Sequence, residues 1–242
     1  MATGPQRDYL GRAQMPAGAR AAELDVGLRA HMQKVFGLMG MGTAVTGLVA
    51  FFTSQSPAMM NLIFNTPLRW AVIFAPLAFV LVLSFGIQRM RASTAQLTFW
   101  AFAAIMGLSL ASIFLVYTGQ SIATTFFVSS ATFLGMALYG YTTKRDLTGW
   151  GSFLFMGLLG LIVASLVGLF IQSSALQFAI SVIGVLIFTG LTAYDTQKIK
   201  EMYYAGDDSE ISGKKAVMGA LSLYLDFINL FLYLLRFIGD RR

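Results

Sequence analysis

Seven apolar runs, each about 20 residues long, constrain the fold of this chain more than any other feature. The hydrocarbon core of a bilayer is about 30 Å thick, and an α-helix needs roughly 20 residues to cross it. The runs cover residues 35–54, 70–88, 97–117, 122–142, 152–172, 175–196 and 216–238. The sequence therefore predicts an all-α membrane protein, a bundle of seven transmembrane helices.

The composition agrees with a membrane protein and excludes several classes of function. Hydrophobic residues make up 57% of the chain and charged residues only 12%. The chain has no cysteine and a single histidine, His31, which excludes disulfides, thiolate metal sites and multi-histidine metal sites. The net charge of +6 comes from basic residues at the ends of the apolar runs, which argues against nucleic acid as a partner.

The first 33 residues are polar and contain no apolar core of the kind found in a signal peptide. We expect residues 1–33 to form a cytosolic leader and residues 34–242 to form one transmembrane domain. Within this region, residues 21–36 fit either a short amphipathic helix on the membrane surface or part of a disordered leader. The sequence leaves these two alternatives open.

The basic residues orient the predicted bundle, because positive residues in short loops stay on the cytosolic side. Thirteen of them fall in the leader and in every second connection, whereas the other connections hold only Arg69. This pattern predicts a cytosolic N-terminus. Seven complete crossings place Arg236, Arg241 and Arg242 outside the cytosol, against this rule. The last run therefore either crosses the membrane despite the rule or enters it and turns back; we expect it to cross.

Two acidic residues stand inside apolar runs. Asp195 lies near the end of the sixth run and Asp226 near the middle of the seventh, while the other nine acids lie in the leader, the loops or the last three residues. An aspartate at the centre of a membrane helix costs about 2.5 to 3.5 kcal/mol on insertion scales. Each is therefore expected to face the interior of the bundle, a water-filled cavity or a partner.

The last run has a polar stripe that passes through its aspartate. Residues spaced three or four apart share one face of a helix, and every polar side chain of the run except Tyr224 falls on that face. The stripe consists of Lys215, Gly219, Ser222, Asp226, Asn229, Tyr233 and Arg236. Such a helix is best placed at the centre of the bundle, with the other six around it.

The two aspartates are the only carboxylates able to meet within the bundle. If they meet, they share one proton and titrate as a pair, because two adjacent carboxylates do not both ionise cheaply. Loss of that proton separates the helices or recruits a cation or an arginine; Arg89 and Arg91 are the nearest candidates. Two alternatives remain open: Asp195 as an anchor at the interface, and Asp226 as a purely structural hydrogen-bonding group.

Two motifs resemble those of the Bax inhibitor-1 family. They are "LTAYDTQKIK" at 191–200 and "ALSLYLDFINLFLYLLR" at 220–236. The resemblance implies a seven-helix bundle with the last helix central, and an aspartate pair that acts as a pH-responsive latch over a calcium-permeable pore. It assigns Asp195 and Asp226 to the latch, as possible calcium ligands too, and expects an arginine, here Arg89, beside them.

The leading hypothesis is therefore a pH-sensitive passive cation leak, with calcium as the ion implied by the resemblance, no enzymatic activity and no cofactor. Ser222 and Asn229 complete the predicted site. The alternative is a membrane-embedded regulator of a membrane AAA protease, as described for bacterial relatives, with the leader as recognition element. A location in a bacterial inner membrane fits both. An intramembrane hydrolase is disfavoured, because no Gly-x-Gly-Asp motif precedes Asp226.

Overall fold

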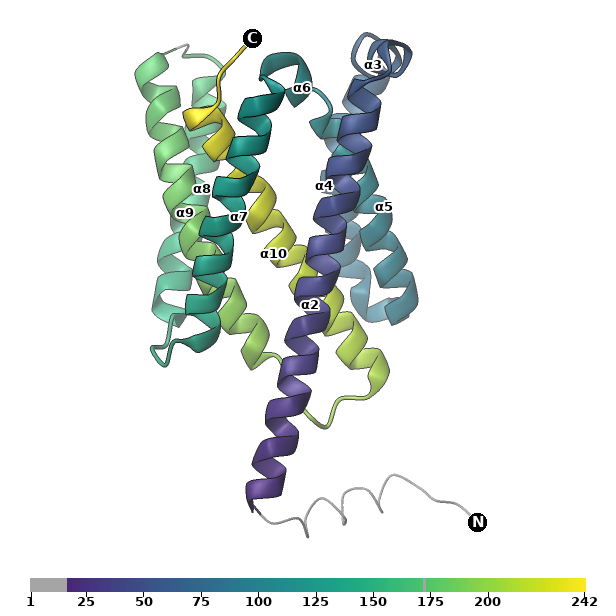
Figure 1. The fold of residues 1–242 in the computed structure, drawn as a ribbon, viewed down its shortest axis with the longest axis vertical. Coiled ribbons are helices and arrows are strands. Elements are labelled where there is room, and N and C mark those ends of the chain that lie inside the picture. Colours follow the sequence, from purple (N-terminus) through teal and green to yellow (C-terminus); the bar gives the residue numbers. More distant parts are fainter. Residues whose placement is uncertain (1–16, 172) are drawn as a thin grey trace.

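A computed structural model of the chain describes residues 17–171 and 173–242, and within them it contains helices and no strands (Figure 1). The long helices are α2 (Ala17–Ser54), α4 (Leu68–Gly86), α5 (Ala92–Leu110), α7 (Gly119–Thr142), α8 (Thr148–Gly168), α9 (Ser174–Glu201) and α10 (Ser209–Ile238). The short ones are α3 (Pro57–Phe64), α6 (Ile113–Val116) and the 3-10 helix η1 (Ile87–Arg89). Seven segments of the described chain are long and apolar enough to span a membrane, which confirms the predicted fold class.

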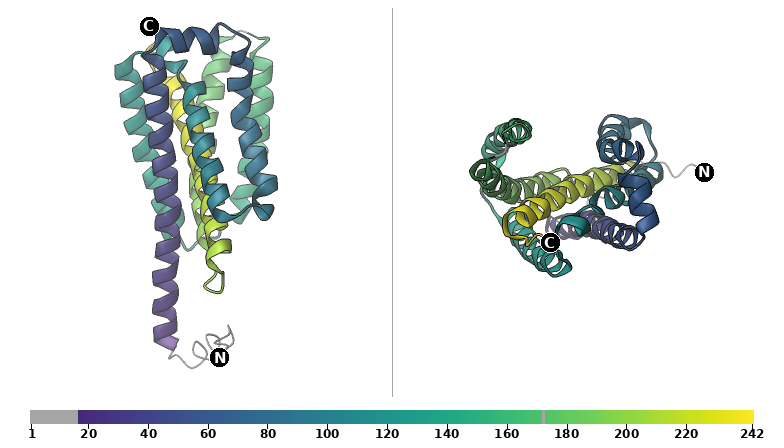
Figure 2. Two further views of the ribbon diagram at one scale, coloured as in Figure 1. Left: turned by 90° about the vertical axis from the view of Figure 1, so that its right-hand side faces the viewer. Right: turned by 90° about the horizontal axis from the view of Figure 1, so that it is seen from above.

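Helix α10 runs diagonally through the centre of the bundle (Figures 1 and 2). It packs against α9, α2, α7 and α5. In its most apolar 18-residue stretch 67% of the residues are buried, whereas the corresponding share is at most 33% in each of the other six spans. At its far end the chain is tied to the start of α7: the Asp240 amide donates to Ser121 Oγ (2.8 Å) and the Thr118 amide donates to the Asp240 carbonyl (3.1 Å). The last helix therefore crosses the whole bundle and does not turn back.

Two boundaries differ from the sequence-based expectation. Helix α2 is continuous from Ala17, so residues 21–36 extend the first span beyond the bundle and form neither a separate surface helix nor a disordered segment (Figure 2). The physical reason is that this segment has no proline and one glycine among good helix formers. The predicted third span is divided, because α5 ends at Leu110 and α6 follows after a turn. Residues 1–16 of the expected leader lie outside the described residues.

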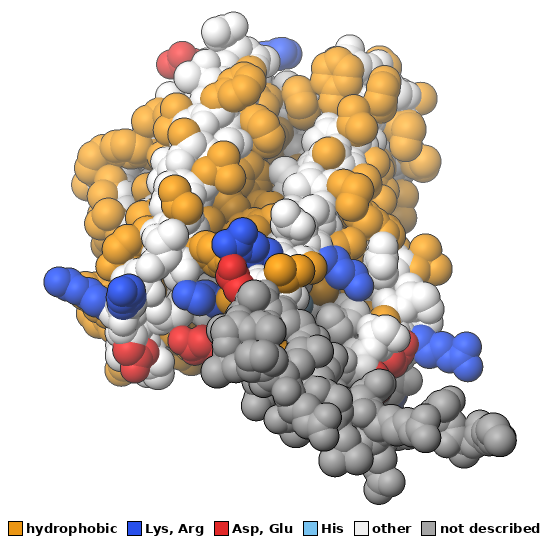
Figure 3. All heavy atoms as spheres, turned by 60° about the horizontal axis from the view of Figure 1, so that its bottom comes forward, with side chains coloured by type: hydrophobic (Ala, Val, Ile, Leu, Met, Phe, Trp, Pro, Cys, Tyr) orange, Lys and Arg blue, Asp and Glu red, His pale blue; other side chains and the backbone are white. Residues whose placement is uncertain are grey.

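One end of the bundle carries most of the charge. The start of α2 and the α4–α5, α7–α8 and α9–α10 connections all lie there, and Figure 3 shows Lys and Arg side chains gathered across it. We call it the basic end. Its residues in these connections and flanking turns are Arg89, Arg91, Lys144, Arg145, Lys198, Lys200, Lys214 and Lys215.

Tyr224, the polar residue that stands off the stripe of α10, joins three helices in the core. Its side chain is fully buried, and its hydroxyl is hydrogen-bonded to Thr46 on α2 at 2.7 Å. Thr46 also donates to the carbonyl of Ala103 on α5 (2.8 Å). The ring of Tyr224 packs edge-on against Phe99 and Phe102, with centroids 5.9 and 5.2 Å apart. This network fixes α10 against α2 and α5.

Gln197, two residues after Asp195, anchors the α7–α8 connection to α9. Its side chain is buried; Oε1 accepts from the Leu147 amide and Nε2 donates to the Arg145 carbonyl, both at 2.8 Å. A single amide side chain thus satisfies one donor and one acceptor of the loop. The glutamine of the "YDTQ" motif has a structural role here.

Replacing Gln197 by alanine is expected to destabilise the bundle by about 1 to 3 kcal/mol, because the buried amide of Leu147 loses its partner. Chemical or thermal unfolding in detergent measures the change. The control is Gln177→Ala, which removes an exposed glutamine from the same helix. Equal free energies of unfolding for the two variants would show that the hydrogen bonds of Gln197 contribute nothing to the stability of the bundle.

Candidate ion and proton site

The structure brings the side chains of Asp195 and Asp226 together. Asp226 lies on the central helix with only 5% of its surface exposed, and Asp195 lies on α9, half-buried. The two carboxyl groups are within hydrogen-bonding reach and interact electrostatically. Two carboxyl groups hydrogen-bond to each other only if one of them carries a proton. An arrangement of this kind is able to hold one shared proton.

Close packing of α9 on α10 produces this meeting. Gly184 on α9 lies under the ring of Tyr233, where a Cβ atom would stand 2.6 Å from the ring carbons. On the same helix, Thr192 and Thr196 donate to the carbonyls four residues before them at 2.8 and 2.7 Å. The hydroxyl protons of these two residues are therefore used within α9.

Both carboxyl groups line one cavity of about 860 Å³. It lies between α4 and α8, with α9 and α10 forming its inner wall, and the side chains of Ser222, Asn229 and Lys198 also reach it. Four of the five residues predicted for the site, Asp195, Asp226, Ser222 and Asn229, thus share a cavity. The polar stripe of α10 is the wall that carries three of them.

The oxygens of this wall are incompletely paired. Asn229 donates through Nδ2 to the Leu225 carbonyl (2.8 Å), which leaves its Oδ1 free to accept. Asp226 Oδ2 is buried and has no hydrogen-bonding partner among the described residues. An unpaired buried carboxylate oxygen is costly, so this atom favours the arrival of a proton or a cation.

Lys198 supplies a positive charge beside the pair. Lys198 follows Asp195 by three residues, interacts with it electrostatically and lines the same cavity. A spacing of three on one helix is the signal in the sequence that points to this contact. The positive-inside pattern alone marks Lys198 only as one of the basic residues at the cytosolic interface.

Arg89 is placed elsewhere. Its side chain is exposed on η1, and the carbonyl of the preceding residue, Gln88, accepts from Lys214 Nζ at 3.5 Å. Lys214 stands twelve residues before Asp226, about 18 Å along α10. The structure does not bring Arg89 to the pair, and its role as counter-ion stays a prediction.

The donor set does not resemble a tight metal site. No group of three or more His, Asp or Glu side chains able to hold a metal ion occurs among residues 17–171 and 173–242 as far as they are described. Calcium takes six to eight oxygen ligands, so two carboxylates with Ser222 and Asn229 need water to complete a shell. This arrangement suits a hydrated cation that binds weakly.

A helical membrane bundle with a carboxyl pair between its central helix, α10, and the neighbouring α9 defines the class of protein. The family profile described as "Inhibitor of apoptosis-promoting Bax1" matches residues 28–242. The chain therefore belongs to the Bax inhibitor-1 family, which confirms the resemblance in the two motifs.

Bacterial relatives match nearly the whole chain. An uncharacterized protein of Rickettsia prowazekii is 51% identical over 218 residues, 90% of this chain and 92% of the relative. The inner membrane protein YbhL of Escherichia coli is 49% identical over 219 residues, covering 89% and 94%. An uncharacterized protein of Caulobacter vibrioides is 46% identical over 243 residues, covering 94% and 95%. The description of the Escherichia coli relative, together with the seven spans of the described residues, supports a multi-pass inner membrane protein.

Because the chain has no cysteine, single cysteines report water access to the cavity without background. Ser222→Cys and Asn229→Cys are expected to react with a charged, membrane-impermeant thiol reagent, since both positions line the cavity. Thr192→Cys is the control, because Thr192 is fully buried. Labelling is read by mass spectrometry; protection of both cavity positions at the level of the control would contradict an aqueous cavity.

Proposed function

We propose that this chain is a passive cation leak of a bacterial inner membrane, in which Asp195 and Asp226 form a proton-sensitive latch between α9 and α10. The observation that carries the proposal is the position of the two carboxyl groups, side by side on the wall of one cavity inside the bundle. The positive-inside rule supports a cytoplasmic basic end. In this proposal, cations enter the cavity from the cytoplasmic side of the membrane.

The latch depends on one proton. While the proton is shared, a hydrogen bond and a single negative charge hold the two helices together. Two unit charges about 4 Å apart repel by roughly 4 kcal/mol at an effective dielectric constant near 20, which shifts an open–closed equilibrium by about three orders of magnitude. Loss of the proton therefore favours separation of α9 and α10, or entry of a cation between the carboxylates.

In this proposal the structure is taken as the closed state. The α10 side of the cavity ends at Tyr233, whose ring stacks on Phe188 with centroids 5.7 Å apart. Arg236 lies over the same ring at 5.6 Å, and Leu234 and Leu235 beyond it are buried. A continuous path therefore requires α10 to move, which the latch controls. Calcium is the permeant ion that the family resemblance favours.

Calcium flux into proteoliposomes is expected to rise as pH rises through the titration of the pair, because the closed state depends on the shared proton. Asp195→Asn and Asp226→Asn should each flatten the response, since an amide does not titrate but still hydrogen-bonds to the remaining carboxyl group. Fluorescent-dye measurements of flux over a range of pH test this directly.

The control for charge is Glu201→Gln, which removes an exposed carboxylate at the end of α9, outside the cavity. It should keep the wild-type pH response. Unchanged pH profiles in both asparagine variants would rule out the proposed latch. The absence of flux in the wild type at every pH would rule out the leak function itself.

The second candidate function is regulation of a membrane AAA protease. The observation that favours it is the extension of α2 beyond the bundle at the basic end, where it is free to contact a partner (Figure 2).

Deleting residues 1–24 stops short of the span that begins at Asp25. If the second candidate holds, this deletion abolishes modulation of the protease and leaves ion flux intact, because the latch is untouched. Proteolysis assays with and without the chain measure the first effect and flux assays the second. Modulation that survives the deletion would count against the extension as recognition element.

A further inference from the structure

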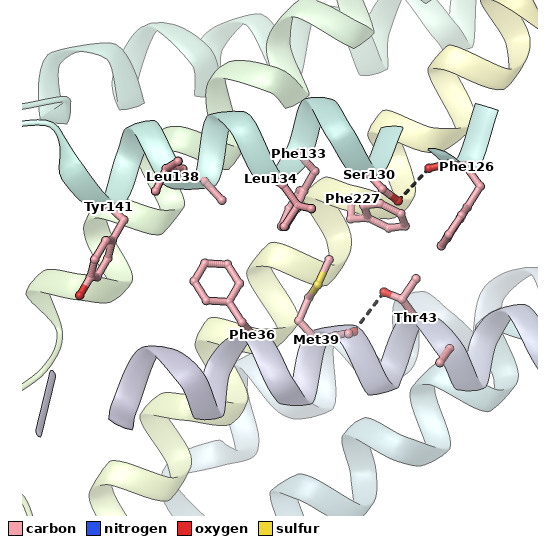
Figure 4. A pocket seen from close by; sticks show the side chains of 13 residues that line it. Phe36, Met39, Thr43, Phe126, Ser130, Phe133, Leu134, Leu138, Tyr141 and Phe227 are labelled. Atoms are coloured by element: carbon pink, nitrogen blue, oxygen red, sulfur yellow. Dashed lines mark hydrogen bonds between the residues drawn. The ribbon is translucent and has the colours of Figure 1, made fainter. Parts of the chain in front are cut away.

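An apolar groove lies on a different face of α10 from the acid cavity, between α2 and α7. Its volume is about 470 Å³, and Phe227 of α10 forms its floor (Figure 4). Through Thr43, Phe126 and Phe227 it continues into a second hollow of about 370 Å³ that reaches α6. The two helices therefore enclose a long channel-like groove that opens sideways.

The middle of the groove leaves no hydrogen-bonding demand on an occupant. Two of the three hydroxyls that line it are satisfied by their own helices: Thr43 donates to the Met39 carbonyl (3.0 Å) and Ser130 donates to the Phe126 carbonyl (2.8 Å), while the third belongs to Tyr141 at one end (Figure 4). Its outer lip is formed by Leu134 and Leu138, which are 62% and 63% exposed. A hydrocarbon chain fits such a surface without loss of any polar interaction.

The groove ends at a positive charge on the basic end. Tyr141 is the lining residue at that end. Lys200 donates from Nζ to the Tyr141 carbonyl (2.9 Å), and the same Nζ lies 5.5 Å from the centroid of the Tyr141 ring. An ammonium group has three donors, so two remain for an anion. Lys144, exposed, follows Tyr141 by three residues. Figure 3 shows basic side chains below a hollow with apolar walls.

We propose that this groove binds one acyl chain of an anionic phospholipid, with the phosphate held by Lys200 and Lys144. Along α7 the lining from Phe126 to Tyr141 extends about 22 Å, longer than the roughly 15 Å of hydrocarbon in one leaflet. A whole chain therefore lies within it while its headgroup stays at the basic end. The charge at this end selects an anionic lipid over a neutral lipid or an apolar protein helix.

Native mass spectrometry of the purified full-length chain, after exchange into mixed phosphatidylglycerol and phosphatidylethanolamine, tests the proposal. One basic residue near an anionic headgroup contributes a factor of about five in affinity. The wild type is expected to retain phosphatidylglycerol at least about fivefold over phosphatidylethanolamine. The double variant Lys200→Met, Lys144→Gln should bring that ratio close to one without abolishing lipid binding.

A matched pair of glycine variants tests the groove itself. Gly40 lines it and has open space where a Cβ would stand, so Gly40→Leu adds a side chain to the groove without a clash at its Cβ. Gly37, one turn earlier on α2, also faces open space but does not line the groove. Gly40→Leu is expected to lower retention of both lipids about tenfold, because each methylene excluded weakens binding roughly fourfold. Gly37→Leu should bind as the wild type does.

Three results would overturn the proposal: equal retention of the two lipids by the wild type, unchanged binding in Gly40→Leu, or a retained second copy of the chain that Gly40→Leu releases. Size-exclusion chromatography and circular dichroism establish that both glycine variants are folded. The lysine variant leaves the groove unfilled, so the headgroup test stands even if Gly40→Leu fails to fold.

Discussion

A carboxyl group buried on the most buried helix is the constraint on which the rest of this structure depends. The bilayer supplies no partner for Asp226, so the bundle itself must provide one. Helix α9 provides Asp195, and both carboxyl groups line the cavity between α4 and α8. A bundle without these features would bury an uncompensated charge; under the proposed function, the charge of this pair depends on one proton.

The packing around the pair determines how the helices can respond to a change in its charge. Gly184 allows α9 to approach the ring of Tyr233 closely, and Gly219 likewise lies against Ile199 of α9. Helices held this closely do not absorb a new repulsion by small side-chain movements, because packed interiors have little free space. A change of one charge is thus more able to displace a helix than it would be in a loose interface.

Helix α10 separates two environments with different chemistry. On one face Ser222, Asp226 and Asn229 line the acid cavity, and on another Phe227 forms the floor of the apolar groove. Adjacent positions on one helix point in directions about 100° apart, so Asp226 and its neighbour serve different surfaces. The groove and the carboxyl pair proposed as the latch therefore both lie on the same helix.

The sequence was sufficient to predict the features that follow from helical periodicity and the cost of polar groups in lipid. It placed the spans, the central position of the last helix and the common face of Ser222, Asp226 and Asn229. It could not determine which basic side chain lies beside the pair, because the position of Arg89 along the bundle axis depends on how α4 packs along α10. Nor could it predict the role of Gln197, whose partners Arg145 and Leu147 are some fifty residues away.

If one shared proton holds α9 and α10 together, the separation of these two helices must depend on pH. Pulsed electron paramagnetic resonance between spin labels on cysteines introduced at exposed positions of the two helices, in the cysteine-free background, measures that separation directly. We expect a short, narrow distance distribution at acidic pH that broadens or lengthens as pH rises, and no such change in Asp226→Asn. A distribution that is the same at every pH in the wild type would contradict the shared-proton latch.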